Sequence, residues 1–292
     1  FFQFTTSHSK FGLKLRCSAA KGYLNPVKKR KNLKIIVNAH VQKLNFNNKS
    51  VESVSFFTGD KLNHAKANKE VILSAGAIGS PHLLQISGIG DSEKIKNQGI
   101  DIVHELKGVG KNLQDHLMFR PVYKLKNIKS LNRDVESLYS KFLMGLQYIL
   151  KQSGPITMGA SQVCAFTKSD PSRATPNLQF HVQPLSTDIL GVTPMHNFEG
   201  ITPTVANIRP TSRGEINITS NDSRDNPKIK MNYLSTEDDR IVAAKSLKLV
   251  RKIMLETETF KKYQPEEYRP GVHITDDEEL VKACLLYTSP SP

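Results

Sequence analysis

The stretch VILSAGAIGSPHLLQISGIG, residues 71–90, constrains the fold more than any other part of the sequence. Its apolar run at 71–73 is typical of a strand covered on both faces, and Gly76 allows the chain to turn without a Cβ clash. Ser80–Pro81 predict a helix start as N-cap and first residue, and Gly88 predicts its C′ residue. A strand that enters a helix through small residues is typical of α/β folds that bring backbone close to a cofactor. Tight packing of a helix on a strand also requires small residues.

The length of the chain allows one large domain or two smaller ones. It has 292 residues, of which 38% are hydrophobic, enough for a sizeable core. No apolar run approaches the ~18 residues of a membrane span. The chain begins with Phe1, and FFQFTTSHSK lacks the charged start and cleavage site of a signal peptide. We therefore interpret the sequence as a piece of a longer protein.

A net charge of +14 makes nucleic acid or an anionic surface a partner to consider. The charges are spread along the chain, however, and the one dense cluster is KKRKNLK at 28–34. No zinc-finger spacing, helix-turn-helix pattern or aromatic-rich basic motif accompanies it. This favours a solvated surface, and a basic nucleic-acid-binding protein is the weaker alternative. Its affinity would fall steeply with added salt.

Cysteines and sequons decide little about the compartment. Cys17, Cys164 and Cys284 have no metal-ligand spacing and no evident pairing, and we predict no metal site. Asn-x-Ser/Thr sequons permit a secretory route and leave localisation undecided. They begin at Asn48, Asn217 and Asn221.

Periodicity predicts a mixed α/β chain whose organisation changes near residue 117. The first part has alternating strands within 33–57 joined at NNKS, a short helix over 91–99 with Asp91 as N-cap, and a strand over 100–106. The second part has two long helices and five strands with little helix between them, which suggests an antiparallel sheet. The helices are predicted at 133–152 and 235–256, and the strands at 161–167, 177–184, 202–209, 214–219 and 228–233. We exclude LLYTSPSP from the fold and interpret 284–292 as a non-native tail.

Two glycine pairs resemble parts of a dinucleotide fingerprint. GIGDSE at 88–93 and GVGKNL at 108–113 both lack its third glycine and its strand-to-helix setting. They are interpreted as turns and helix stops.

The motifs in their order resemble the glucose-methanol-choline (GMC) flavoprotein oxidoreductases. GAIGSPHLLQISGIG is similar to the family's second signature, which has a small pair, Ser-Pro, two aliphatics and Ser-Gly-aliphatic-Gly. The resemblance covers roughly residues 10–270 and is closest to the insect glucose-dehydrogenase-like branch. Further similar segments are RCSAAKGYLNPVKKRKNLKIIVNAHVQKL, GVGKNLQDH, SGPITMGASQVCAF, NLQFHV and TSRGEINITSNDSRDNPKIKMNYL.

The resemblance implies a fold, domains and a cofactor. Residues 1–116 would be part of an FAD-binding domain, and 117–283 a substrate domain on an antiparallel sheet with the start of the C-terminal domain. The backbone of Val41 would meet the adenine of FAD, and Ala75 and Gly76 would lie near the cofactor. The loop residues Asn112, Asp115 and His116 would anchor the junction of the domains without taking part in the chemistry.

The implied reaction is hydride transfer from a primary alcohol or sugar hydroxyl to the flavin, with a histidine as general base. The family's pyrophosphate-binding glycine motif and its catalytic histidine match no residue of this sequence. We therefore assign no catalytic residue and expect a fragment that holds FAD poorly and is inactive by itself. The electron acceptor, quinone or oxygen, stays open. A non-catalytic flavoprotein-like paralogue is the main alternative, and it would lack the histidine in the full reading frame.

Overall fold

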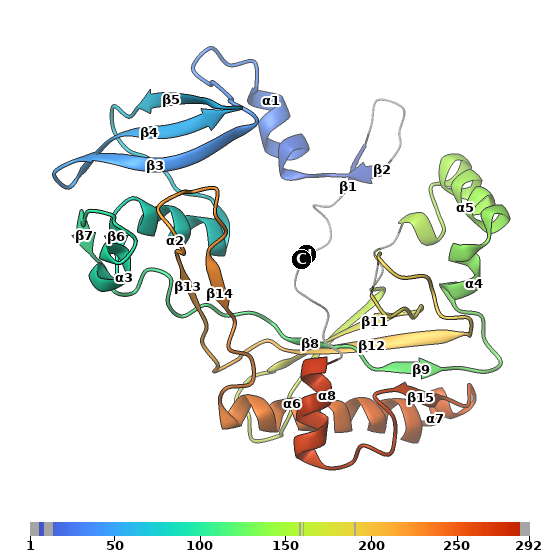
Figure 1. Ribbon diagram of the computed structural model, residues 1–292. Coiled ribbons are helices and arrows are strands. Elements are labelled where there is room, and N and C mark those ends of the chain that lie inside the picture. Colours follow the sequence, from blue (N-terminus) through green and yellow to red (C-terminus); the bar gives the residue numbers. More distant parts are fainter. Residues whose placement is uncertain (1–5, 9–13, 158, 160, 190, 287–292) are drawn as a thin grey trace. The chain divides into compact units, whose positions relative to one another are not determined.

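The computed structural model describes residues 6–8, 14–157, 159, 161–189 and 191–286 (Figure 1). The chain divides into two compact units. The α2 unit contains residues 23–115 and 212–233, and the α6 unit contains the described residues of 1–22, 116–211 and 234–292. Residues 212–233 therefore fold with the first half of the chain, which a single boundary at 116/117 does not capture. The assignment of 1–116 and 117–283 to functional domains stays a prediction.

The α2 unit is built on an antiparallel sheet of three strands in the order β3–β4–β5, joined by two tight turns. Asn48, with φ 53°, lies in the first turn, as the NNKS motif predicted. A short parallel pair, β6–β7, and an antiparallel pair, β13–β14, complete the unit. Its elements are α1 (Asn25–Val27), β3 (Ala39–Asn47), β4 (Ser50–Thr58), β5 (Lys61–Lys66), α2 (Gly76–Ile86), β6 (Ile89–Gly90), α3 (Ser92–Lys96), β7 (His104–Glu105), β13 (Glu215–Asn217) and β14 (Lys228–Lys230), preceded by η1 (Ala20–Leu24).

The α6 unit is built on an antiparallel sheet in the order β10–β11–β12–β9–β15, and β8 also pairs with β12. Its elements are β1 (Thr6–His8), β2 (Lys14–Arg16), β8 (Met118–Phe119), β9 (Val122–Lys124), α4 (Leu131–Glu136), α5 (Leu138–Lys151), η2 (Pro155–Thr157), β10 (Val163–Thr167), β11 (Leu178–Gln183), β12 (Gly200–Asn207), α6 (Glu237–Arg251), η3 (Lys252–Glu256), α7 (Glu258–Lys261), β15 (Glu266–Arg269) and α8 (Asp277–Leu286). Three of the five predicted strands, β10, β11 and β12, confirm the antiparallel sheet. The other two predicted strands, at 214–219 and 228–233, correspond to β13 and β14, which pair with each other in the α2 unit. Among the described helices, none is long and apolar enough to cross a membrane.

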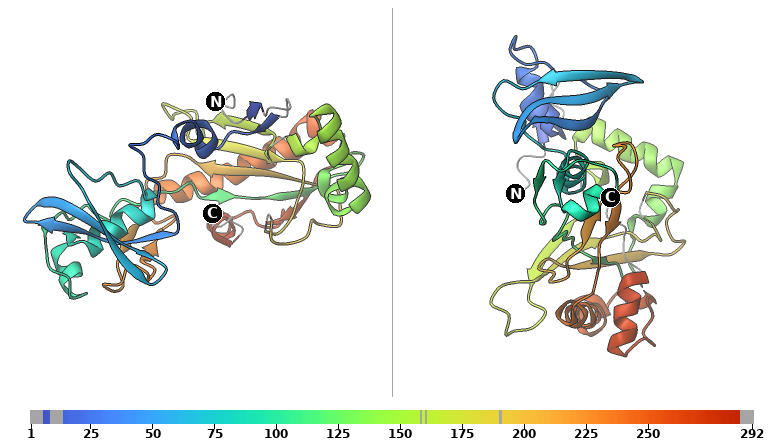
Figure 2. Two further views of the ribbon diagram at one scale, coloured as in Figure 1. Left: turned by 90° about the horizontal axis from the view of Figure 1, so that it is seen from above. Right: turned by 60° about the vertical axis from the view of Figure 1, so that its left-hand side comes forward.

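The core of the α6 unit lies between this sheet and α6. Val242, Leu247 and Val250 project from one side of α6 at helical spacing and are at most 1% exposed. They pack with Phe180 and Val205 from the strands. α6 runs along the strands and shares one face of the sheet with α8 (Figures 1 and 2). One face of the sheet is therefore apolar and covered by helices.

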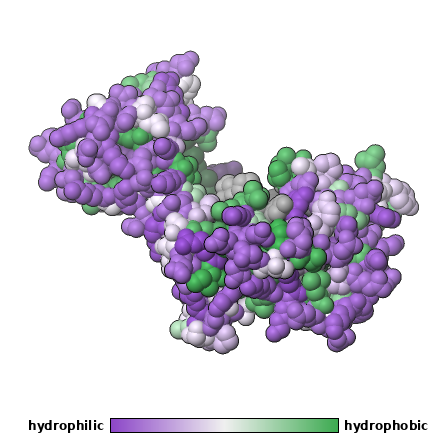
Figure 3. All heavy atoms as spheres, turned by 60° about the horizontal axis from the view of Figure 1, so that its bottom comes forward, coloured by the Kyte–Doolittle hydropathy of each residue, from purple (hydrophilic) through white to green (hydrophobic). Residues whose placement is uncertain are grey.

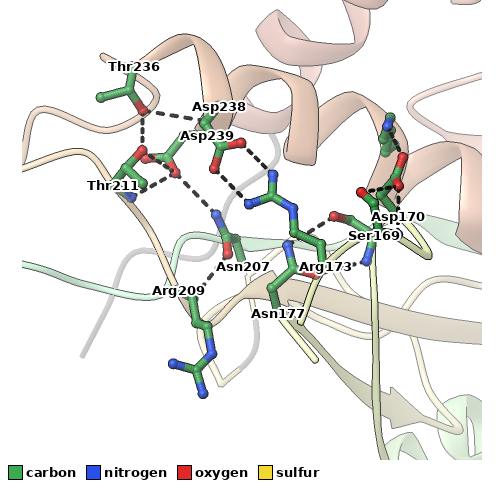
Figure 4. Close-up of polar contacts among 12 residues, drawn as sticks. Ser169, Asp170, Arg173, Asn177, Asn207, Arg209, Thr211, Thr236, Asp238 and Asp239 are labelled. Atoms are coloured by element: carbon green, nitrogen blue, oxygen red, sulfur yellow. Dashed lines mark hydrogen bonds and ion pairs between the residues drawn. The ribbon is translucent and has the colours of Figure 1, made fainter. Parts of the chain in front are cut away.

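A polar network fixes the start of α6 to the ends of the strands (Figure 4). Thr236 is the N-cap, and its hydroxyl accepts the N–H of Asp239 at 3.4 Å. The Asp239 carboxylate is 2% exposed and accepts the N–H of Thr211 at 2.9 Å and the Asn207 amide at 3.2 Å. Arg173 pairs with Asp238 in the same turn. The carboxylates lie at the positive end of the helix dipole, so they stabilise the helix in addition to holding its first turn in place.

The apolar run at 71–73 is not a strand, contrary to the sequence prediction. It has no regular structure, and the side chain of Ile72 is 77% exposed. A buried strand requires neighbours on both sides and a layer on each face. No described strand pairs with this segment, so the apolar run alone does not form one. Residues 33–38 are also irregular, and β5 was not predicted.

α2 begins at Gly76, earlier than the predicted start at Pro81. The hydroxyl of Ser80 accepts the N–H of Ala75 at 3.1 Å, so it serves the helix from within its first turns. Pro81 therefore lies inside the helix, where it removes one backbone donor. The other end agrees with the prediction, because Gly88 follows the C-cap with φ 85°.

The predicted helix over 133–152 is two helices. The extended backbone of Ser137 (φ −70°, ψ 122°) ends α4 and begins α5, with its hydroxyl accepting the N–H of Ser140. The apolar face of α5 is exposed among the described residues: Leu138 is 82% and Phe142 66% exposed. Figure 3 shows hydrophobic residues reaching the surface in several places on one face of the molecule.

Residues 284–286 are part of the fold, contrary to the prediction of a tail over 284–292. They belong to α8, and Cys284 is 1% exposed within the core, where burial raises the pKa of its thiol to about 12. The fourth-residue spacing of Leu280 and Cys284 puts both on the buried side of the helix. Residues 287–292 lie outside the described residues.

Replacement of a core residue of α6 should cost far more than replacement of an exposed one. We expect Leu247→Ala, at a side chain with no exposed surface, to lower the free energy of unfolding by about 2–5 kcal/mol because it leaves a cavity. Ile241→Ala on the same helix, at a residue 44% exposed, should cost less than about 1 kcal/mol. Urea unfolding followed by far-ultraviolet circular dichroism suits a chain without Trp. Equal losses would contradict the described core.

Candidate functional site

The start of α2 leaves open space where a side chain would otherwise lie. Gly76 has φ 78°, and a Cβ added to it would meet no atom within 4 Å. Ala75 before it is exposed. A positive φ favours glycine, so the turn needs Gly76 for its backbone conformation, while the small side chains leave the main chain accessible.

Val41 lies on β3, next to a shift in the strand register. Val41 pairs with Phe56 and Lys43 with Ser55, so Gln42 is the extra residue, as in a β-bulge. Bulges re-aim the local backbone and are frequent beside functional sites. The Val41 side chain is 36% exposed.

The structure brings the strand of Val41 and the helix of Gly76 together within the α2 unit. α2 packs against β3. The hydroxyl of Ser87 at the end of α2 accepts the N–H of Leu44 at 2.9 Å and donates to the carbonyl of Leu83 at 2.6 Å. Two segments that the sequence analysis assigned to one cofactor site thus belong to one packed unit. The roles of Val41, Ala75 and Gly76 themselves stay predictions.

Gln85, which sequence reasoning missed, joins three distant segments. Its side chain is 5% exposed. The amide nitrogen donates to the carbonyl of Ile216 at 2.9 Å, and the amide oxygen accepts the N–H of Ile218 at 2.9 Å. A longer bond of 3.4 Å reaches the carbonyl of Val109. The sequence offered one sign of this role, because Gln85 is a polar residue within the otherwise apolar last turn of α2.

Gly110 is required by the same contact. It has φ 80°, and an added Cβ would overlap the carbonyl oxygen of Ile216 and the amide of Gln85. Its own carbonyl accepts the N–H of Ile216 at 2.7 Å. Gly110 of the GVGKNL motif therefore allows a close backbone approach, and both glycines of the motif lie in a turn, in agreement with their interpretation as turn residues.

Charged groups reinforce this junction. The Glu215 carboxylate binds Lys111 and, at 3.2 Å, Lys94, whose ammonium also donates to Asn217 at 2.7 Å. Hydrogen bonds from Lys111 and then Lys94 lower the pKa of Glu215 to about 2 from its usual 4.5. The Asn217 side chain of one sequon is thus bound within the fold.

The structure gives local contacts and backbone geometry for two of the residues expected at the junction of the domains, while their role as anchors there stays a prediction. The Asp115 carboxylate accepts the hydroxyl of Tyr233 at 2.5 Å, and burial together with this carboxylate raises the pKa of Tyr233. Asn112 has φ 59° in the turn before it. Asp115 and His116 fall where the α2 unit ends and the α6 unit begins.

In the α6 unit, the sheet has a second face, on the side away from α6 and α8. On β12 the side chains of Pro203 and Val205 point to these helices, so Thr202 and Thr204 point the other way. We call this second side the open face because α6 and α8 do not lie on it, although Thr202 and Thr204 are themselves buried. Among the described residues, no group of three His, Cys, Asp or Glu could hold a metal ion.

Comparison with known proteins identifies the class. Two models described as GMC oxidoreductase match residues 5–118 and 210–289, the N-terminal and C-terminal parts of that family. The chain belongs to the GMC oxidoreductase family.

Similar curated proteins include two named oxygen-dependent choline dehydrogenase. The one from Pectobacterium atrosepticum is 34% identical over 265 residues, and the one from Staphylococcus xylosus 37% over 267. Each match covers 91% of this chain and 47% of the relative, so the chain spans about half the length of the curated relatives it matches. The similarity is therefore not specific to the insect glucose-dehydrogenase-like branch that the motifs suggested.

A solved structure confirms the fold. Formate oxidase of Aspergillus oryzae RIB40 superposes with a TM-score of 0.81 at 22% identity, over 90% of this chain and 51% of that one. The predicted fold class, mixed α/β with an antiparallel sheet, is confirmed.

Removal of the Gln85 amide should loosen the junction of the α2 unit. Gln85→Leu leaves buried backbone groups of Ile216 and Ile218 without partners, so we expect a loss of about 2–4 kcal/mol in the free energy of unfolding. Gln98→Leu, a control at a less buried glutamine, should change it by about 0.5 kcal/mol or less. Urea melts measure both. Similar values for the two variants would show that the Gln85 bonds contribute little.

Acid should weaken the α2 unit through Glu215. Because the folded pKa is depressed to about 2, this carboxylate stabilises the fold above its unfolded pKa of about 4.5, and the effect is lost as the pH falls towards 2. Glu215→Gln should reduce the pH dependence of unfolding in this window. The check compares urea melts of both proteins at several pH values. Parallel pH profiles would contradict the assignment.

Proposed function

We propose that the chain is part of an FAD-dependent oxidoreductase that oxidises a CH–OH group of a small alcohol or sugar. The observation that supports this most is the match of both family models, in their order, to residues 5–118 and 210–289. The relatives act on an alcohol by their names. Membership of an oxidoreductase family removes the support for the nucleic-acid-binding alternative.

The residues assigned to the cofactor fit it. Gly76 offers main chain with open space at its Cβ position, Ala75 is exposed, and Val41 lies where β3 departs from regular pairing. Val41 would hold the adenine end through its backbone, and Ala75 and Gly76 would lie along the cofactor. FAD, when bound, supplies the redox chemistry by accepting the hydride.

The chain itself would orient both partners of the reaction. Gln85 and Gly110 fix α2 against β13 and so hold the segment of Gly76 in place. The antiparallel sheet of the α6 unit would present the alcohol. The base that takes the hydroxyl proton is assigned to no residue of this chain.

Two kinds of substrate are candidates within this class, a sugar and choline. The motif resemblance favours a sugar alcohol group, as in glucose dehydrogenases, whereas the named relatives favour choline. The names of these relatives call them oxygen-dependent, which favours oxygen as the electron acceptor, and a quinone is the alternative. Reduction of the flavin in the full-length protein by an alcohol would distinguish an enzyme from a non-catalytic paralogue.

Replacement of Gly76 should affect FAD more than a matched change elsewhere. Gly76 and Gly59 both have positive φ (78° and 58°), and neither has an atom within 4 Å of an added Cβ. Alanine at either position should therefore cost a similar backbone strain of about 1–2 kcal/mol. Only Gly76→Ala should also raise the dissociation constant of FAD, by about tenfold, or about 1.4 kcal/mol.

The measurement is a flavin titration of the folded, FAD-depleted full-length protein beside urea melts of both variants. Unchanged FAD affinity in Gly76→Ala would show that this glycine serves the turn alone.

A further inference from the structure

Arg120 is a buried cation on the open face of the sheet. It lies between the strands β8 and β9, and the side chain of the preceding Phe119 belongs to the core beneath the helices. Side chains alternate along a strand, so Arg120 projects to the other face, where its Nη2 donates to Oε1 of Gln183 at 3.0 Å. Arg120 is 9% exposed.

Within the described part of the chain, no carboxylate pairs with Arg120. Its one bond there goes to a neutral amide oxygen, and burial lowers the pKa of its guanidinium. A guanidinium nevertheless stays charged at physiological pH and has five N–H donors. Burial of a charge without a counter-ion is costly.

Arg251, another arginine with little exposed surface, is fully paired. Arg251 has a side chain 15% exposed and binds the wholly buried Glu267 through two bonds of 2.9 Å. It also donates to the carbonyls of Ile274 and Gly271. Arg120 differs from this arrangement because its side chain is equally buried but lacks the anion.

A second group beside Arg120 is also unsatisfied. Thr204 is 2% exposed, and its hydroxyl has no hydrogen-bond partner among the described residues. Phe119 pairs with Val205 across the strands, so the next residue, Arg120, comes beside Thr204. On its other side Thr204 pairs with His181. An unpaired hydroxyl and a guanidinium without a counter-ion among the described residues thus lie on one face of adjacent strands.

Gln183 orients this group. Its amide nitrogen donates to the hydroxyl of Ser161 at 3.3 Å, which leaves its oxygen directed at Arg120. Thr202, the strand partner of Gln183, has its hydroxyl satisfied by the carbonyl of Leu185 at 2.8 Å. The lack of a partner is therefore specific to Thr204 and is not shared along β12.

We infer that Arg120, Thr204 and Gln183 form a binding site for a carboxylate, with Arg120 and Thr204 as its donors and Gln183 holding the guanidinium. This inference rests on the proposed function: the carboxylate is part of the alcohol substrate, which is therefore a hydroxy acid. A guanidinium pairs well with a carboxylate because their planar groups allow two parallel bonds. It repels a quaternary ammonium, so choline is a poor substrate although the named relatives are choline dehydrogenases.

Binding is tested on the full-length protein, without reference to turnover. Sodium acetate and glycolate are the probes, and tetramethylammonium chloride at equal ionic strength is the control. We expect both carboxylates, and not the control, to raise the thermal midpoint. Arg120→Met should lower the affinity for both carboxylates at least tenfold. Without a probe, the variant should be no less stable than the wild type, because it removes a buried charge that has no counter-ion.

Arg251→Met is the matched control. It leaves the buried Glu267 carboxylate with the Tyr123 hydroxyl and the Gly271 N–H but without a counter-ion, so it should lower stability strongly. If Arg120→Met lowers stability as much as Arg251→Met, then Arg120 has a partner within the protein and the inference is wrong. It is also wrong if neither carboxylate raises the midpoint of the wild type.

Two threonine variants give a second test should Arg120→Met fail to fold. Thr204→Val removes an unpaired hydroxyl, so stability should be kept while affinity for acetate falls several-fold. Thr202→Val leaves the carbonyl of Leu185 unpaired, so stability should fall while acetate affinity is kept. The reverse pattern, or equal acetate affinity in both variants, would overturn the site.

Turnover separates this inference from the proposed function. Anaerobic flavin reduction is compared for glycolate against ethylene glycol and for gluconate against sorbitol, pairs in which a carboxylate replaces one CH2OH group. We expect faster reduction by the acid of at least one pair, and loss of that preference in Thr204→Val. Carboxylate binding without flavin reduction by any alcohol would contradict the proposed function alone. Flavin reduction without carboxylate binding or preference would contradict the site alone.

Discussion

The packing of α6 against one face of the antiparallel sheet is the constraint on which the α6 unit depends. It buries the side chains of β11 and β12 that point to the helices, Phe180 and Val205 among them, with Leu247 at the centre. Because strand side chains alternate, every residue placed in this core fixes its neighbour on the open face. Arg120 and Thr204 lie there for this reason, and a shift of one residue in register would exchange the faces.

In the α2 unit a single buried amide has the corresponding role. Gln85 uses both its donor and its acceptor on the backbone of β13, and Gly110 permits the approach because it has no side chain. These contacts join residues more than a hundred positions apart in the chain. They explain why the segment 212–233 folds with the first half of the sequence, and why the signature around 76–90 and the loop at 107–116 occur together.

The two candidate sites differ in how they relate to stability. At Gly76 an added Cβ would meet no atom within 4 Å, and the cofactor role proposed for this position carries no cost in unsatisfied groups. At Arg120 a buried charge is retained whose one hydrogen bond among the described residues goes to a neutral amide, beside the Thr204 hydroxyl, which has no partner there. Unsatisfied buried groups of this kind are expected to persist where a ligand completes them. The comparison with Arg251, which is fully paired, shows that the fold can satisfy a buried arginine.

The sequence by itself determined what depends on neighbours along the chain. The N-cap Asp91, the turn at Asn48, Gly88 after α2 and the alternating strands β3 and β4 were predictable, since each follows from local hydrogen bonds or backbone preference. Only the tertiary structure decided what depends on distant partners. It left residues 71–73 without a neighbouring strand to pair with, divided the predicted helix at Ser137 and buried Cys284. It also placed Gln85 and Arg120 in contact with residues 63 to 133 positions away in the chain. Residue types cannot reveal such contacts, because a buried polar group is defined by the segments that pack around it.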